Sequence, residues 1–122
     1  MTDIEIEKEI QAKGKSAPRL TPDHIESVIV SEHYFTAGDG YAGAAALNAQ
    51  EGELIVPPEP LDLLTICVLI LRNGFTVTGE SACVSPKNFD VEIGRKAARQ
   101  KAIDKIWTLE GYLLKENWRS NW

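Results

Sequence analysis

The stretch LTICVLILRNGFTVTGESA, residues 64–82, carries the clearest structural signal in the chain. Residues 64–71 are rich in β-branched and aliphatic side chains, and residues 75–78 resume that composition after Asn73-Gly74. An Asn-Gly pair between two such runs is the strongest short-range indication of a β-hairpin, because both residues tolerate the positive φ of a tight two-residue turn. The sequence therefore predicts an antiparallel hairpin that turns at Asn73 and Gly74.

A two-residue turn also predicts which residues face each other and which face the core. Ile70 then lies opposite Val77, and Cys67 lies opposite Glu80. Because side chains alternate along a strand, one face becomes the expected core face. Its residues are Leu64, Ile66, Val68, Ile70, Phe75, Val77, Gly79, Ser81 and Cys83. Cys67 falls on the other face, so we expect two free thiols in a reducing compartment.

A first helix is predicted before the hairpin. Thr21-Pro22 is a typical helix start, because threonine caps an orphan amide and proline at the first helical position loses no hydrogen bond. Ile25, Val28 and Ile29 recur at helical spacing, which predicts a helix from Pro22 to about residue 34 or 35. The glycine-rich residues 36–43 end it, with one further helical turn at 44–48, and the prolines of residues 53–60 predict an extended loop.

A long helix is predicted after the hairpin. Asn88 is the expected cap, and helix-forming residues continue to about Glu116, with Thr108 as the candidate position of a kink. The apolar arc of this helix is unusually wide. One hairpin and one short helix cover too little of such an arc, so the pattern predicts a homo-oligomer. The expected fold class is α+β.

Length and composition indicate one domain. The chain has 122 residues and 43% hydrophobic residues, and we expect a domain over residues 19–118 between a disordered tail at 1–18 and a short tail at 119–122. Residues 1–60 carry four Lys/Arg and eleven Asp/Glu, and residues 61–122 carry nine and seven. The excess of Lys and Arg in the second half is too small to favour duplex nucleic acid as a partner. With no signal sequence and no apolar run of about 18 residues, a soluble cytoplasmic protein without a membrane partner is expected.

Charged residues within the apolar arc of the long helix are the strongest functional indication. These residues are Glu92, Arg95, Arg99 and Glu110. Two arginines one helical turn apart could bind a phosphate or carboxylate with their planar guanidinium groups. The alternative, which we favour, is a network of ion pairs, with Glu92 bonded to Arg95 or with bridges across a subunit interface. The candidate ligand-binding residues are Arg95, Arg99, Tyr34 and Glu80.

Catalytic and metal sites are not indicated. His24 and His33 stand nine residues apart without a cysteine or carboxylate at a recognised metal spacing, so no metal or cofactor is expected. Neither histidine can be placed near a cysteine as a base, which argues against a nucleophilic thiol and against an enzyme. Trp118 and Trp122 near the C-terminus are candidates for contact with a partner, such as a neighbouring subunit.

The chain resembles a family of small tailed-bacteriophage proteins, named for gene forty-nine of one podophage and gene sixty-six of another. The resemblance covers roughly residues 21–115. Its distinctive strings are SEHYFTA at 31–37, RNGFTVTGESAC at 72–83, NFD at 88–90, EIGR at 92–95, AI at 102–103, IW at 106–107 and LEGYLL at 109–114. Similar proteins often have proline at the position of Thr108, which favours a kink there.

The resemblance implies a phage or prophage protein that is made in the cytoplasm of the infected bacterium, and it supplies no catalytic residues. Small accessory phage proteins frequently act by binding. We therefore expect one that counters host defence, either by sequestering a nucleotide-like signal or by inhibiting a host protein. The alternative is a structural or assembly homo-oligomer without a ligand, and a hydrolase has almost no support.

Overall fold

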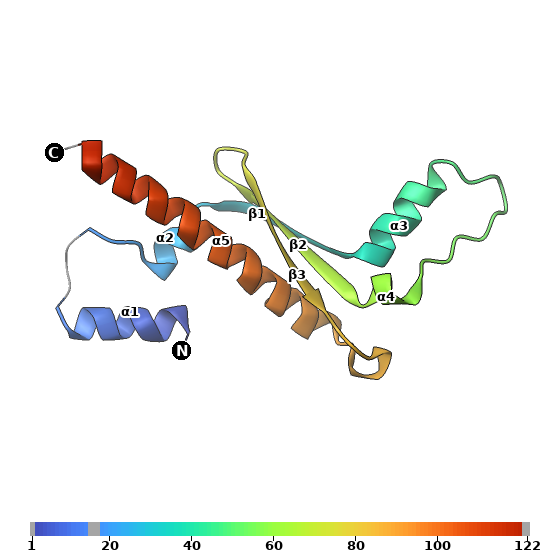
Figure 1. The fold of residues 1–122 in the computed structure, drawn as a ribbon, viewed down its shortest axis with the longest axis horizontal. Coiled ribbons are helices and arrows are strands. Elements are labelled where there is room, and N and C mark those ends of the chain that lie inside the picture. Colours follow the sequence, from blue (N-terminus) through green and yellow to red (C-terminus); the bar gives the residue numbers. More distant parts are fainter. Residues whose placement is uncertain (1, 15–17, 121–122) are drawn as a thin grey trace.

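The computed structural model describes residues 2–14 and 18–120 and shows an α+β fold, as predicted. Three antiparallel strands form a sheet in the order β1-β2-β3, and the long helix α5 packs across β2 and β3 (Figure 1). The elements in order are α1 (Asp3–Ala12), α2 (Pro22–Ser27), β1 (Ile29–Thr36), α3 (Ala37–Ala46), α4 (Glu59–Asp62), β2 (Leu64–Leu71), β3 (Thr76–Ala82), the short 3₁₀ helix η1 (Pro86–Asn88) and α5 (Val91–Ser120).

The hairpin is present, but its turn has three residues and not two. The amide of Gly74 donates to the carbonyl of Leu71 at 2.8 Å, and the amide of Leu71 donates to the carbonyl of Phe75 at 2.8 Å. Gly74 has a φ of 89°, the left-handed conformation that closes a three-residue hairpin loop. The predicted register is therefore wrong by one residue, and Cys67 lies opposite Gly79.

This shift exchanges the faces of β2. Its buried residues are Thr65, Cys67, Leu69 and Leu71, and its half-buried residues are Leu64, Ile66, Val68 and Ile70. The predicted core face is thus wrong for β2, although it is right for Val77 and Gly79 of β3. A one-residue slip moves every side chain of a strand to the other face, which explains the error.

Both cysteines are free, as predicted, but the reason differs from the one expected. Cys67 is buried in the middle of β2. Cys83 lies beyond the end of β3, where its amide donates to the carbonyl of Leu63 at 2.9 Å. The two thiols are therefore separated along the strands and not by the thickness of the sheet.

The predicted first helix ends early, at Ser27, and residues 29–36 form the edge strand β1. β-Branched and aromatic residues fit a pleated surface, and pairing with β2 outweighs the weak helical periodicity. The predicted glycine-rich break is also wrong, because α3 begins there. Thr36 and Asp39 form a capping box: Asp39 N donates to Thr36 Oγ1 at 3.1 Å, and Thr36 N donates to Asp39 Oδ2 at 2.9 Å.

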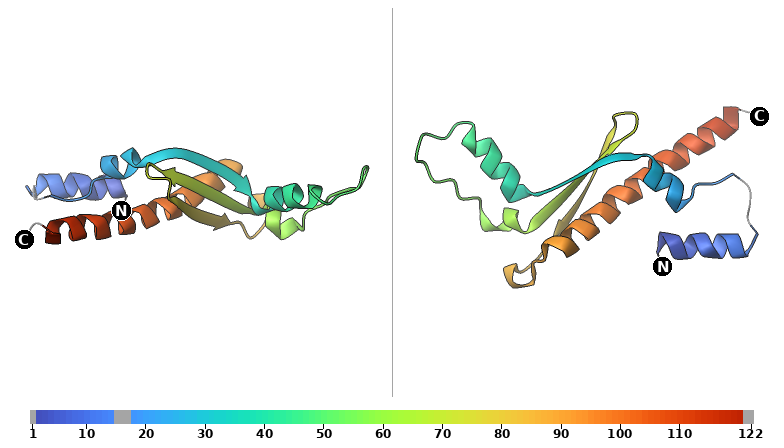
Figure 2. Two further views of the ribbon diagram at one scale, coloured as in Figure 1. Left: turned by 90° about the horizontal axis from the view of Figure 1, so that it is seen from above. Right: turned by 180° about the vertical axis from the view of Figure 1, so that it is seen from behind.

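The prediction of an unstructured N-terminal tail is wrong for α1. Thr2 and Glu5 form a capping box at its start. The indole nitrogen of Trp107 donates to Asp3 Oδ2 at 3.2 Å, which joins α1 to α5. Residues 15–17 of the expected tail lie outside the described residues. Figure 2 shows α1 and the C-terminal end of α5 at one end of the molecule and the α3–α4 arm at the other.

Helix α5 begins later and runs further than predicted. Asp90 caps it, since its carboxylate accepts from the amide of Ile93 at 2.9 Å, whereas the predicted cap Asn88 belongs to η1. The helix continues without a break through Thr108 to Ser120, past the predicted end at Glu116. Trp118 is 49% exposed, and Trp122 lies outside the described residues.

The core forms where small residues let α5 approach the sheet. Buried residues of α5 pack against β2, β3 and α2, and they are Ala98, Ala102, Ile103 and Ile106. A Cβ atom at Gly79 would lie 2.0 Å from the carbonyl oxygen of Ala98 and 2.5 Å from the amide nitrogen of Ala102. β3 therefore contacts the backbone of α5 directly, and only glycine fits at this position.

Gly79→Ala is expected to destabilise the fold by at least about 2 kcal/mol, because overpacking against backbone atoms forces α5 away from the sheet. The melting temperature should fall by at least about 8 °C. Gly43→Ala in α3 is the matched control, because nothing lies within 4 Å of its new Cβ. That change should stabilise the protein by about 0.5–1 kcal/mol. Equal melting temperatures for Gly79→Ala and the wild type would contradict the close contact.

Candidate functional site

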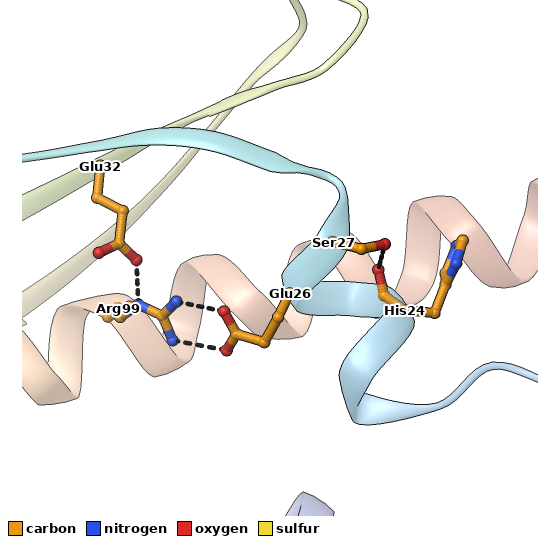
Figure 3. Close-up of polar contacts among 5 residues, drawn as sticks. All are labelled: His24, Glu26, Ser27, Glu32 and Arg99. Carbon is orange, nitrogen blue, oxygen red and sulfur yellow. Dashed lines mark hydrogen bonds and ion pairs between the residues drawn. The ribbon is translucent and has the colours of Figure 1, made fainter.

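The predicted residue Arg99 joins three elements. From α5, its Nη1 and Nη2 donate to the two carboxylate oxygens of Glu26 in α2, at 3.0 and 2.7 Å (Figure 3). Its Nε donates to Glu32 in β1. This two-carboxylate arrangement uses Nε, Nη1 and Nη2 of the guanidinium group, as expected for a structural ion-pair network.

Charge and hydrogen bonding reinforce each other in this network. The bonds from Arg99 hold the pKa of Glu26 below its ordinary value of 4.5, although partial burial opposes the shift. The same bonds raise the pKa of Arg99, and the hydrogen bond to Glu26 is the largest cause of this shift. Arg99 therefore stays fully charged and engaged near neutral pH, and it offers little binding capacity to another anion.

Other charges in the apolar arc of α5 also meet partners. His24 Nε2 and Glu110 Oε1 are 3.0 Å apart, which ties α2 to α5 a second time. Glu92 lies 3.9 Å from Lys96, and not beside Arg95 as the predicted pair required. The position of Glu110 within the apolar arc of α5 is thus explained by its contact with His24 of α2.

Arg95 is placed differently from Arg99. It is exposed, and its guanidinium carbon lies 5.5 Å from the ring centroid of Tyr34 in β1. A cation over an aromatic face is attracted by the negative charge of the π-system. Within the described residues, no carboxylate forms an ion pair with Arg95. Arg95 therefore retains its hydrogen-bond donors for an anionic ligand.

The ring of Tyr34 lies beneath that arginine and is half-buried. Burial, followed by the neighbouring Cys67 and Glu32, raises the pKa of Tyr34 to about 12. Its phenol is therefore neutral near pH 7. Burial likewise raises the pKa of the Cys67 thiol, which opposes formation of a nucleophilic thiolate.

A depression of about 680 Å³ lies beside this pair at the edge of β1. Its lining residues are Glu32, His33, Tyr34, Phe35, Val68 and Arg95. Glu80, the fourth predicted ligand residue, lies apart. It is opposite Ile66 in the register, so it belongs to the sheet face away from α5.

Two parts of this region were not predicted from the sequence. Glu26 and Glu32 are the partners of Arg99, although 67 or more positions separate them from it. A second cavity, of about 560 Å³, lies among α1, α2 and α5, with Asp3, Asp104 and Trp107 in its wall. The excess of Asp and Glu in the first half of the chain was the available signal for the carboxylate partners of Arg99. No feature of the sequence indicated the second cavity.

Neither a metal cluster nor a membrane-spanning helix is found in the described part of the chain. There, no three His, Cys, Asp or Glu side chains gather as they would around a metal ion. Among the same residues, no helix is long and apolar enough to cross a membrane.

Comparison with known proteins identifies the family. Residues 20–118 match the model of the phage protein (N4 Gp49/phage Sf6 gene 66) family. The chain belongs to this family. No curated protein and no solved structure matches it. The phage family segment includes every strand, α2 and nearly all of α5, whereas α1 precedes it.

All residues of the arginine sites fall within the phage family segment. Arg95 and Tyr34 form one pair, and Arg99 with Glu26 and Glu32 forms the other. The two sites lie one helical turn apart on α5, yet one is saturated by carboxylates and the other is open. This difference separates an arginine held in ion pairs from one that forms no ion pair with a carboxylate among the described residues.

Glu26→Gln is expected to lower stability at neutral pH and to make less difference in acid. A carboxyl with a folded pKa below its unfolded pKa contributes stability above the unfolded value, and that contribution is lost as pH falls through the folded value. The difference in unfolding free energy between wild type and variant should therefore shrink as pH falls below 4.5. Urea unfolding at several pH values measures it.

The control for this prediction is Glu92→Gln, since Glu92 is exposed and only 3.9 Å from Lys96. Such an exposed pair contributes little. A pH-independent difference for Glu26→Gln would show that Arg99 does not stabilise the charged carboxylate.

The two thiols are expected to differ in reactivity. Cys67 is fully buried and has a raised pKa, whereas Cys83 is half-buried with its Sγ bonded to the carbonyl of Ser85 at 3.2 Å. An aromatic disulfide reagent should modify Cys83 first, and Cys67 only at the rate of unfolding. Cys83→Ser should abolish the fast phase alone. Two fast phases in the wild type would contradict the burial of Cys67.

Proposed function

We propose that this phage protein acts by binding, without catalysis, in the cytoplasm of the infected host. Its ligand is an anionic, nucleotide-like molecule, and Arg95 is the residue that contacts the anion. Sequestration of such a molecule would counter a host defence that uses it as a signal. The single observation that carries this proposal is the exposed guanidinium of Arg95 over the ring of Tyr34, without a carboxylate partner in the described residues.

Electrostatics supports Arg95 over Arg99 as the ligand residue. Glu26 and Glu32 already accept three hydrogen bonds from Arg99, so an anion would have to displace them. Arg95 keeps a planar set of N–H donors that matches a phosphate in a bidentate manner. Its contact with Tyr34 restricts the rotamers of the guanidinium, which lowers the entropy lost on binding.

The surroundings of Arg95 suit the remainder of a nucleotide. The depression beside it contains the rings of His33, Tyr34 and Phe35. Aromatic rings stack with nucleobases irrespective of base identity, so they contribute affinity with little hydrogen-bond readout. A nucleotide could place its phosphate at Arg95 and its base against these rings, so that one ligand would contact both the arginine and the aromatic side chains.

Arg95→Ala is the test. A thermal-shift panel of linear and cyclic nucleotides should raise the melting temperature of the wild type for at least one member. Loss of a charge-assisted bidentate contact costs about 1.5–3 kcal/mol, so Arg95→Ala should weaken that ligand by about tenfold to a hundredfold.

Lys96→Ala is the matched control, because Lys96 follows Arg95 and is also exposed to solvent on α5. It removes the same charge without the aromatic platform and should leave binding unchanged. The proposal is wrong if no nucleotide shifts the wild type, or if Arg95→Ala and Lys96→Ala weaken binding equally.

A further inference from the structure

The C-terminal part of α5 extends past the strands and carries apolar side chains in solvent (Figures 1 and 2). Among the described residues, Ile106 is the last one of α5 that is buried. Three large apolar side chains beyond it are exposed, and they are Leu109, Tyr112 and Leu113. Apolar residues that gather on one exposed stretch of a helix are typical of a surface that contacts another molecule.

Two of these residues belong to a stripe with the spacing of a coiled coil, here called the seam. Its positions are 105, 109, 112 and 116, at intervals of four, three and four residues, so their side chains share one face of α5. Leu109 and Tyr112 form the apolar centre, with Lys105 at one end and Glu116 at the other. These intervals are the same when read from either end. A second α5 that runs in the opposite direction therefore presents a matching stripe.

A groove lies beside the first half of the seam, between α5 and the start of β3. It has a volume of about 560 Å³, with residues 75–78 as one wall and Lys105, Thr108 and Leu109 as the other. Phe75 is exposed next to Leu109, so the groove is partly apolar. Tyr112 lies further along α5, beyond the groove. Each chain thus has both a groove and an extension of helix of the size to enter one.

We propose that a second copy of this chain covers the seam, with the two α5 helices antiparallel about a twofold axis. Leu109 then packs against the partner's Tyr112. Moving four residues outward from that pair brings Lys105 beside the partner's Glu116. The axis passes between the two equivalent Leu109 contacts, so the extension of each helix enters the groove of the other chain.

Charge complementarity selects the antiparallel arrangement. It places a lysine against a carboxylate at both ends of the contact, whereas a parallel pair would place Lys105 against Lys105 and Glu116 against Glu116. Within its own chain, Lys105 bonds the hydroxyl of Thr78 at 3.5 Å, and Glu116 accepts from Arg119. An ammonium has three donors and a carboxylate has about four acceptor sites, so both groups can form the additional bond.

The length of the seam sets the strength of the contact. From Lys105 to Glu116 the helix rises about 16 Å, which is short for a coiled coil. The dimer should therefore be reversible and should depend on concentration. Arg95 lies near the other end of α5, so dimerisation and ligand binding can fail independently.

Sedimentation velocity over a concentration series tests the contact with the full chain. The wild type should pass from 13.5 kDa to twice that mass as concentration rises. Tyr112→Glu should stay monomeric throughout, because an unpaired carboxylate in the apolar centre raises the dissociation constant by about a hundredfold or more. Ile93→Glu, a like change at an exposed position near the start of α5, should dimerise as the wild type does. An unchanged circular dichroism spectrum shows that each variant is folded.

A charge exchange tests the antiparallel register. Lys105→Glu should weaken the dimer about tenfold, because it faces the partner's Glu116, and Lys105→Glu with Glu116→Lys should restore it. Within one chain these residues are about 16 Å apart along the helix, so restoration requires the partner. The proposal is overturned if the wild type is monomeric at every concentration, if Tyr112→Glu and Ile93→Glu dimerise equally, or if the double variant is no tighter than Lys105→Glu.

Discussion

The backbone contact between β3 and α5 is the constraint on which the other contacts depend. Gly79 leaves no space for a Cβ atom between the strand and the helix, and Ala98 and Ala102 keep the facing side of α5 small. The height and rotation of α5 above the sheet are thereby fixed. With Ala98 directed at the sheet, its neighbour Arg99 emerges beside α2 and β1, within reach of Glu26 and Glu32.

The same constraint places Arg95 one helical turn earlier, over Tyr34. Because that turn lies beyond α2, no carboxylate from α2 reaches it. Two arginines with the same chemistry therefore differ through position alone: one cross-links three elements, and the other keeps free donors.

The sequence predicted those features that depend on local chemistry. The hairpin at Asn73-Gly74, the long helix and the α+β class needed only composition, turn residues and periodicity. The turn length was predicted wrongly because Asn-Gly also fits a three-residue loop in which only Gly74 has positive φ. The difference of one residue in turn length reversed the predicted faces of β2. β1 was missed because its identity as a strand comes from pairing with β2, a contact between distant residues.

The candidate site was predicted in part for the same reason. Arg95, Arg99 and Tyr34 lie on one side of the sheet, where Arg95 contacts Tyr34 and Arg99 contacts Glu26 and Glu32, whereas Glu80 is on the other. The partners of Arg99 required the fold. The uneven distribution of charge along the chain is partly explained by this network. Glu26 and Glu32 of the acidic first half form ion pairs with Arg99 of the basic second half.

The wide apolar arc of α5 is only partly explained by the core. Beyond the sheet, large apolar side chains of α5 stay exposed, with Tyr112 at 72% and Leu113 at 51%. The half-buried aliphatic residues of β2 are on the sheet face away from α5, whereas these residues belong to the helix layer on the other side. The excess of apolar surface thus divides into two separate regions, one on the sheet face away from α5 and one at the C-terminal end of α5.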